Sequence, residues 1–148
     1  MAASTTAPPA TVPDDLVDLL TTDRLGHVSA VRPDGSIAQY LMWMDWDGGH
    51  VLTSSQVGSR KGSHWRRDPH VTVSVVDRDD PWRYLVIRGR VTEMRPDDEL
   101  AFIDKMSERY TGSPYMRRDA PREVFVITPD HVIASRGRRA WRPSAPDV

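Results

Sequence analysis

The segment GHVSAVRPDGSIAQYLMWMDW, residues 26–46, decides the fold that this chain adopts. Its two parts, 26–32 and 36–46, are rich in β-branched and aromatic residues, and Pro33-Asp34-Gly35 separates them. Two β-rich runs around a turn of this composition predict a β-hairpin. A dense β region of the chain therefore begins with this hairpin.

The same signals predict further strands and a few helices outside this hairpin. Turn residues at 47–49 lead to a third strand, so the first three strands should form a meander. The later strands are expected at 70–77, 82–94 and 123–128, with 131–135 as a continuation. Helices are expected at 14–21, at 59–67 and from residue 97 until the stop signal at 111–114. Six or seven mostly antiparallel strands with a few helices favour a small β-barrel, because closure removes exposed strand edges.

The second predicted strand carries apolar residues on both of its faces. Ile37, Leu41 and Trp43 alternate with another apolar set, namely Tyr40, Met42, Met44 and Trp46. One set can fill the barrel interior. The other must meet a helix, a flat ligand or a second subunit, because a wet apolar face is unfavourable.

Composition limits the classes of protein that the chain can belong to. A length of 148 residues suits one domain, expected at 14–135, with flexible tails at 1–13 and 136–148. The formal net charge of -1 gives no reason to expect a general nucleic-acid binder. There is no cysteine, no signal-peptide pattern and no apolar run long enough to span a bilayer. A cytoplasmic protein without a membrane partner is therefore expected.

The segment Gly58-Ser59-Arg60-Lys61-Gly62 is the first indication of a function. Arg60 and Lys61 occupy the expected first turn of a helix, where backbone N–H groups already carry partial positive charge. Two further cations are unfavourable there unless an anion binds between them. A phosphate would be stabilised by the N–H groups, a serine hydroxyl and both side chains.

This segment and its surroundings resemble the pyridoxamine 5'-phosphate oxidase-like, FMN-binding split barrels. The resemblance covers roughly 14–135 and rests on Thr53-Ser54, Ser59-Arg60-Lys61-Gly62 and the strand 83–91. Within that superfamily the chain is similar to the flavin/deazaflavin oxidoreductases that depend on coenzyme F420. That likeness is carried by short stretches at 66–69, 79–84, 109–112 and 127–132.

The resemblance implies a homodimeric split barrel with cofactor sites at the subunit interface. It implies that Lys61 and Arg60 hold the cofactor phosphate and that Ser59 and Ser54 donate hydrogen bonds, and it places Thr53 among the cofactor-binding residues. It also implies that the strand of Gln39 runs along the ring system and that Trp82 borders the pocket. The cofactor rather than a protein nucleophile would carry the redox chemistry.

The expected cofactor is coenzyme F420, with FMN as the alternative. Arg60 with Lys61 suits the phosphate monoester of FMN, whereas the wider segment is more similar to the deazaflavin branch. The expected activity is hydride transfer from reduced F420 to a small electron-poor acceptor such as an enone, quinone or tetrapyrrole. The alternatives are an FMN-dependent oxidoreductase of the pyridoxamine-phosphate-oxidase type and a non-catalytic F420- or flavin-binding carrier or sensor.

Other polar residues suggest further roles. His27, Tyr84 and Tyr110 are candidate proton donors, although each residue type is more often structural at such positions. A basic cluster near the C-terminus could contact the polyglutamate tail of F420 or form a solvated tail; it comprises Arg136, Arg138, Arg139 and Arg142. The five histidines lack the paired spacing of a metal site, so no metal is expected.

Overall fold

The computed structural model describes residues 8–137, and it is mainly β with a few short helices. Seven strands form one sheet in the order β2-β1-β5-β6-β7-β4-β3, and every neighbouring pair is antiparallel. The strands are β1 (Gly26–Val31), β2 (Ile37–Met42), β3 (Asp45–Trp46), β4 (Val51–Gln56), β5 (His70–Val76), β6 (Arg83–Pro96) and β7 (Arg122–Arg136). The helices are η1 (Asp14–Leu16), α1 (Asp18–Thr21), α2 (Arg60–Arg67), η2 (Asp98–Leu100) and α3 (Ala101–Thr111). The predicted fold class is confirmed.

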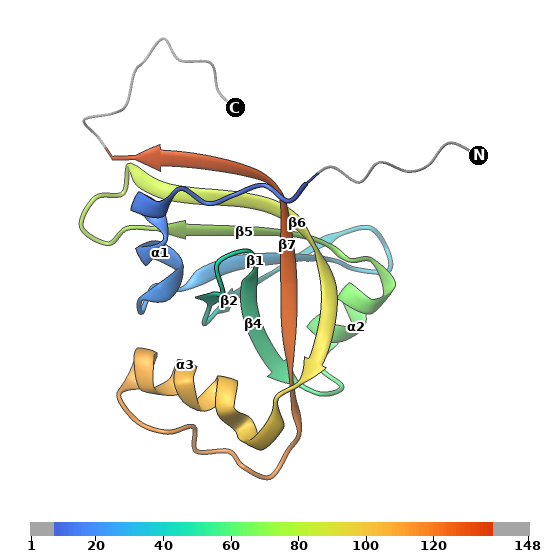
Figure 1. The fold of residues 1–148 in the computed structure, drawn as a ribbon. Coiled ribbons are helices and arrows are strands. Elements are labelled where there is room, and N and C mark those ends of the chain that lie inside the picture. Colours follow the sequence, from blue (N-terminus) through green and yellow to red (C-terminus); the bar gives the residue numbers. More distant parts are fainter. Residues whose placement is uncertain (1–7, 138–148) are drawn as a thin grey trace.

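The long strands β6 and β7 connect the two halves of the curled sheet (Figure 1). β6 pairs with β5 along its first half, whereas β7 pairs with β4 along its first half and with β6 along most of its length. The register of β6 against β7 shifts between Arg88 and Gly89 and again between Val91 and Glu93. At the first shift the backbones approach so closely that a Cβ on Gly89 would lie 2.3 Å from the carbonyl oxygen of Thr128. A glycine is therefore needed where the strand bends.

The predicted strand 36–46 is two strands, and this part of the prediction is wrong. β2 pairs with β1, the β-strand is interrupted at Trp43 and Met44, and β3 pairs with β4 in the other half of the sheet. Side chains satisfy the backbone at the break: Thr53 Oγ1 donates to the Trp43 carbonyl (2.7 Å), and Met44 N donates to the Tyr110 hydroxyl (3.1 Å). The strand can end there because its polar groups keep partners.

The N-terminal boundary also differs from the expected one. Val12 is buried in the core, and Ala10 N donates to the carbonyl of Pro129 (2.9 Å), so the fold begins before residue 14. The leucines at 16, 19 and 20 fill the core that η1 and α1 cover. The expectations for 1–7 and 138–148, including those for Arg138, Arg139 and Arg142, lie outside the described residues.

Helix α3 begins later than the sequence pattern predicts. Asp97 does not start the helix but accepts hydrogen bonds from the backbone of Phe102 (2.8 Å) and Ile103 (2.9 Å). Between them, Glu99 and Leu100 adopt positive φ angles of 56° and 58°. The buried Asp97 carboxylate therefore caps the helix from outside its first turn.

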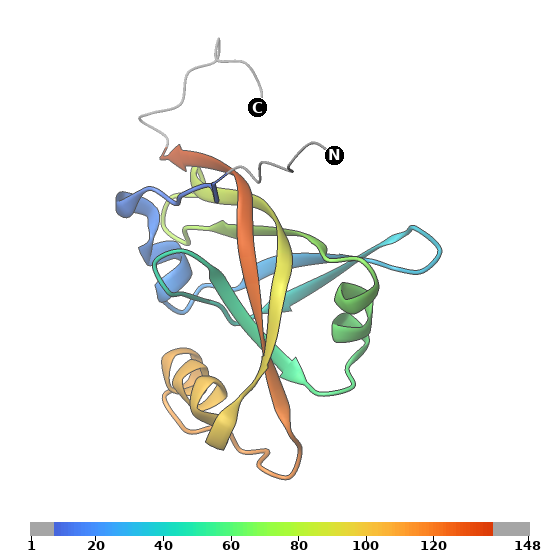
Figure 2. The same cartoon turned by 45° about the vertical axis from the view of Figure 1, so that its right-hand side comes forward.

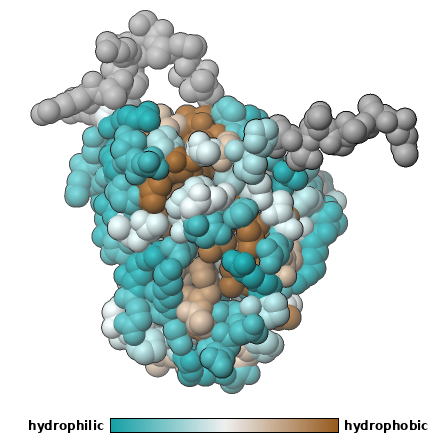
Figure 3. All heavy atoms as spheres, in the orientation of Figure 1, coloured by the Kyte–Doolittle hydropathy of each residue, from teal (hydrophilic) through white to brown (hydrophobic). Residues whose placement is uncertain are grey.

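The helices lie on opposite sides of the barrel. Figures 1 and 2 place α2 on one side and both α1 and α3 on the other. On the face shown in Figure 3 most atoms are hydrophilic, and hydrophobic atoms form separate patches rather than one continuous area. That face therefore offers no single large apolar surface.

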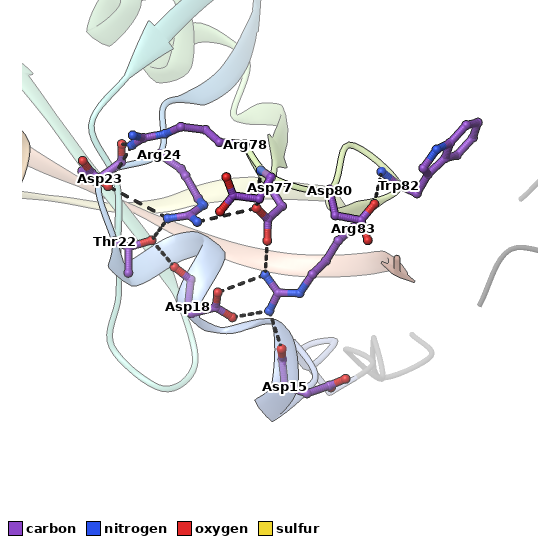
Figure 4. Close-up of polar contacts among 11 residues, drawn as sticks. Asp15, Asp18, Thr22, Asp23, Arg24, Asp77, Arg78, Asp80, Trp82 and Arg83 are labelled. Atoms are coloured by element: carbon purple, nitrogen blue, oxygen red, sulfur yellow. Dashed lines mark hydrogen bonds and ion pairs between the residues drawn. The ribbon is translucent and has the colours of Figure 1, made fainter. Parts of the chain in front are cut away.

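A network of ion pairs fixes α1 to the turn between β5 and β6 (Figure 4). Arg83 donates to Asp18 (3.0 Å) and to Asp77 (2.8 Å), and Arg24 pairs with Asp77 (3.6 Å). Hydrogen bonds from Arg83 hold the pKa of Asp18 below its usual value. Hydrogen bonds from Arg78 do the same for the pKa of Asp23.

We expect this network to make the protein less stable in acid. A carboxyl whose pKa is lower in the folded than in the unfolded chain adds stability above its unfolded pKa, and this contribution is lost as the pH falls through the folded value. The loss should begin below about pH 4, the region of an unperturbed aspartate. Thermal melts between pH 3 and pH 7 measure it. In Arg83→Gln the melting temperature should fall less steeply as the pH is lowered below about 4. An unchanged dependence of the melting temperature on pH would contradict this role of Asp18 and Asp77.

Candidate functional site

A cavity of about 370 Å³ lies between β4, the first turn of α2, helix α3 and the segment 112–121. Its lining contains two basic residues and no acidic residue. The lining residues are Leu41, Met42, Trp43, Ser54, Ser55, Gln56, Lys61, Ile103, Tyr115 and Arg122. The volume falls within the range typical of small-molecule sites.

The first basic residue, Lys61, is held in the cavity by the start of α2. Its Nζ lies 5.0 Å from the ring centroid of Tyr40, a cation–π distance. Burial, followed by the nearby charge of Arg122, lowers the pKa of the Lys61 amine. Within residues 8–137 no carboxylate forms an ion pair with Lys61.

The start of α2 is fixed by a serine cap and a buried glycine. Ser59 Oγ accepts a hydrogen bond from Gly62 N (3.2 Å) and so satisfies one of the free N–H groups of the first turn. A Cβ on Gly62 would lie 3.0 Å from both Arg66 Nη1 and Glu123 Oε1. The Ser-Arg-Lys-Gly order therefore places Lys61 as well as starting the helix.

The second basic residue, Arg122, is the site residue that sequence analysis missed. It begins β7 opposite Gln56 of β4, and its Nη2 donates to Ser54 Oγ (3.2 Å). Its guanidinium lies 4.9 Å from the ring centroid of Tyr115, and Nη1 donates to the Tyr115 hydroxyl (3.4 Å). Nε is buried without a hydrogen-bond partner, and burial lowers the pKa of the guanidinium.

Nothing in the sequence around Arg122 marks it as a site residue. It follows Pro121 at the start of a strand, as many surface arginines do, and it lies 61 positions after Lys61. The two meet because β4 and β7 pair, which is a long-range contact. Arg122 could have been identified only from its position opposite Gln56, and that position is known only once the pairing of β4 with β7 is known.

Lys61 and Arg122 together create a site that fits an anion. Removing a charge from water costs free energy unless a partner compensates it, and two cations in one cavity also repel each other. No carboxylate of residues 8–137 forms an ion pair with Arg122 either. A phosphate could accept hydrogen bonds from the Lys61 amine and the Arg122 guanidinium and remove the repulsion between them.

The other predicted cofactor residues are spread over several places. Ser54 lines the cavity, whereas Thr53 is fully buried and its hydroxyl bonds the Trp43 carbonyl. Arg60, Gln39 and Trp82 are exposed and do not line this cavity. Figure 4 shows the Trp82 ring pointing away from the ion-pair network at the β5–β6 turn.

The three candidate proton donors do not line the cavity. His27 is exposed on β1 and Tyr84 is half-buried on β6. The Tyr110 hydroxyl donates to the Arg24 carbonyl (2.5 Å) and accepts from Met44 N, and burial raises its pKa. Tyr110 thus holds α3 against the barrel, and Tyr115 is the phenol that borders the cavity.

Residues 8–137 lack two further features, a membrane-spanning helix and a metal site. No helix in this range is long and apolar enough to cross a membrane. The described side chains also contain no group of three or more His, Asp or Glu residues arranged to hold a metal ion.

The fold and the cavity together define a split β-barrel protein with a cation-lined site. The sequence profile of the pyridoxamine 5'-phosphate oxidase family matches residues 12–136, and the chain belongs to this family. No curated protein matches the chain in sequence.

Several solved structures are similar to this chain. A structure named F420 Reductase shares 34% identity, with a TM-score of 0.75, and the match covers 82% of this chain and 98% of that chain. A conserved hypothetical protein of Mycobacterium tuberculosis shares 21% identity at a TM-score of 0.70, covering 99% and 98%. General Stress Protein 26 of Bacillus anthracis shares 19% identity at a TM-score of 0.66, covering 84% and 94%. The last two are similar in fold alone, and the predicted resemblance to the split-barrel superfamily is confirmed.

Proposed function

We propose that this chain is an oxidoreductase that uses reduced coenzyme F420 to transfer a hydride to a small electron-poor organic acceptor, such as an enone, quinone or tetrapyrrole. The observation that carries the proposal is the pair of half-buried cations, Lys61 and Arg122, in a cavity without a carboxylate. Membership of the family supports an oxidoreductase of the F420 or flavin type. The structure named F420 Reductase, at 34% identity, favours F420 over FMN.

Each residue of the site has a physical role in this proposal. Lys61 and Arg122 bind the cofactor phosphate, and Ser54 orients Arg122 by accepting its Nη2 hydrogen bond. Ser59 caps α2 through its oxygen lone pair and keeps its O–H free to donate to the phosphate. The cofactor, when bound, supplies the hydride. Trp43 and Tyr115 give the cavity aromatic walls that exclude water from the ligand.

The proposal includes a homodimer with the cofactor at the subunit interface. Ile37 is 62% exposed and Leu41 is 60% exposed on β2, with Gln39 between them on the same face. Gln39 and Trp82 lie outside the cavity of their own chain, so they would meet a cofactor across such an interface. Sedimentation at micromolar concentration tests this part, and a monomer with F420 bound would contradict it.

Titration of the purified protein with F420 and, separately, with FMN tests the cofactor assignment. We expect F420 to bind more tightly, as followed by cofactor fluorescence, and binding to weaken with salt because charged groups dominate the contact. Tighter binding of FMN would replace the F420 proposal with the flavin-dependent alternative.

Turnover tests the enzymatic part separately. Reduced F420 bound to the protein should be oxidised by at least one member of a panel of enones, quinones and tetrapyrroles, as measured by the return of F420 absorbance. A protein that binds reduced F420 but leaves it unreactive across the panel would be a carrier or sensor instead.

A further inference from the structure

The segment 112–121 forms one wall of the cation-lined cavity. It connects α3 to β7 and brings Tyr115 into the cavity lining. The Tyr115 ring meets Trp43 edge-on, with ring centroids 6.5 Å apart, and it lies under the guanidinium of Arg122. The position of this segment therefore determines how open the cavity is.

The middle of the segment, residues 114–120, is anchored through few polar contacts. Outside the segment itself, the hydrogen bonds of residues 114–120 run to Asp104 and Arg122 within the described part of the chain. Asp104 Oδ1 accepts from Tyr115 N (3.0 Å), and its two oxygens accept from Arg118 Nη1 (2.9 Å) and Nη2 (3.0 Å). Arg118 also donates to the carbonyl of Tyr115 (3.1 Å). One carboxylate on α3 thus holds both the backbone of Tyr115 and the side chain that braces it.

Apolar packing does little to hold the tip of the segment. Met116 is 93% exposed, and Arg117, Arg118 and Asp119 are also exposed. Gly112 at one end caps α3 in a left-handed conformation with a φ of 79°, and the Pro121 carbonyl accepts from Val57 N (3.0 Å) at the other end. A surface segment with few buried contacts opens at low free-energy cost, so its remaining anchors determine how often it opens.

An exposed ion pair alone contributes little, but the arrangement at Asp104 differs from a simple pair. The contact with Arg118 is bidentate, and the same carboxylate binds a backbone N–H. The Arg118 hydrogen bond, followed by the one from Tyr115 N, lowers the pKa of Asp104. The carboxylate is therefore charged at neutral pH and holds three donors at once.

We propose that Asp104 is a positioning residue that holds segment 112–121 in place as a wall of the cavity and controls the access of anionic ligands to Lys61 and Arg122. The proposal rests on the proposed function only in treating this cavity as the ligand site. Asp104 itself is not in the cavity lining, so it acts through Tyr115.

Amine labelling gives a direct test, because Lys61 and Lys105 are the two lysines of the chain. Lys61 lies in the cavity, whereas the Lys105 side chain is 62% exposed and serves as a reference in the same molecule. The labelling rates of both amines with an N-hydroxysuccinimide ester are measured by mass spectrometry in the cofactor-free protein. We expect Asp104→Ala to raise the labelling rate of Lys61 about tenfold relative to that of Lys105. The variant removes hydrogen bonds to a charged group, and their loss should shift the equilibrium between the closed and open positions of the segment by about this factor.

Two further variants make the test specific. Arg118→Gln keeps Asp104, the residue that precedes the reference Lys105, so the surroundings of Lys105 do not change. This variant should also raise the labelling rate of Lys61, by a smaller factor. Asp130→Ala is the matched control, since Asp130 also holds an arginine, Arg90, in a bidentate pair (3.0 and 3.0 Å) but does not line this cavity. It should leave the Lys61 rate unchanged.

The outcomes separate clearly. A faster Lys61 rate in Asp104→Ala and Arg118→Gln, but not in Asp130→Ala, supports the proposal. An unchanged Lys61 rate, or an equal rise in all three variants, overturns it, and Arg118→Gln decides alone if Asp104→Ala does not fold. Because the assay contains no cofactor, a failure of F420 or FMN to bind would refute the proposed function without affecting this result.

Discussion

Replacing Lys61 by alanine is expected to weaken cofactor binding by about 1.5 to 3 kcal/mol, roughly 10- to 150-fold in Kd, the scale of a hydrogen bond to a charged group. The amine lines the cavity and has no carboxylate ion pair within residues 8–137, so its removal should cost ligand contacts rather than protein stability. Fluorescence titration with F420 measures the change in Kd. Unchanged affinity would remove Lys61 from the site.

Arg122 and Arg60 provide the comparison that locates the anion. Arg122→Gln should lose a similar amount, because it removes the guanidinium with the buried, unpartnered Nε. Arg60→Ala should lose less than about 0.5 kcal/mol, the scale of an exposed charge. Equal losses from Arg60 and Lys61 would show that the phosphate lies at the outer surface of the first turn of α2, between these two side chains, rather than in the cavity beside Arg122.

The affinity should also depend on pH through Lys61. Burial and the charge of Arg122 lower the pKa of the amine in the free protein, and a bound anion would raise it again. Binding is therefore expected to take up protons in alkaline solution, and affinity should fall as the pH rises through the free-state pKa. Lys61→Ala should abolish this alkaline dependence while a residual affinity from Arg122 remains.

The strands were predictable from sequence because their signals are local. The β-rich runs around the 33–35 and 47–49 turns lie in β1 to β4, and the helix predicted at 59–67 is α2. What the sequence could not show is how the second run divides at Met44. That division depends on Tyr110, which follows 66 residues later. Long-range contacts of this kind decide where a strand ends, and composition does not report them.

The candidate site shows the same difference between residues marked by local sequence patterns and residues placed by long-range contacts. Lys61 and Ser54 stand in or near a contiguous motif, and both line the cavity. Arg122 enters from the neighbouring strand β7 through its pairing with β4, so no local pattern indicates it. Arg60 was predicted beside Lys61, but neighbouring residues in the first turn of a helix point in different directions, and Arg60 is exposed.

Trp65→Ala is expected to lower the free energy of unfolding by about 3 to 5 kcal/mol, the usual cost of removing a large aromatic side chain from a core. Trp65 is 2% exposed, meets Phe125 edge-on with ring centroids 4.9 Å apart, and donates from Nε1 to the Ser29 carbonyl (3.2 Å). It is the large buried side chain of α2, so its loss should also loosen the helix that positions Lys61.

Urea denaturation of Trp65→Ala, Trp65→Phe and Met116→Ala separates packing from hydrogen bonding. Trp65→Phe keeps a ring against Phe125 and should lose less than the alanine variant, with the lost Nε1 hydrogen bond contributing about 1 kcal/mol. Met116 is 93% exposed, so Met116→Ala should change stability by less than about 0.5 kcal/mol. If Trp65→Ala lost no more than Met116→Ala, α2 would not be held by its buried face. The first turn of α2 would then depend on the Ser59 cap and the close packing of Gly62 to keep Lys61 beside Arg122.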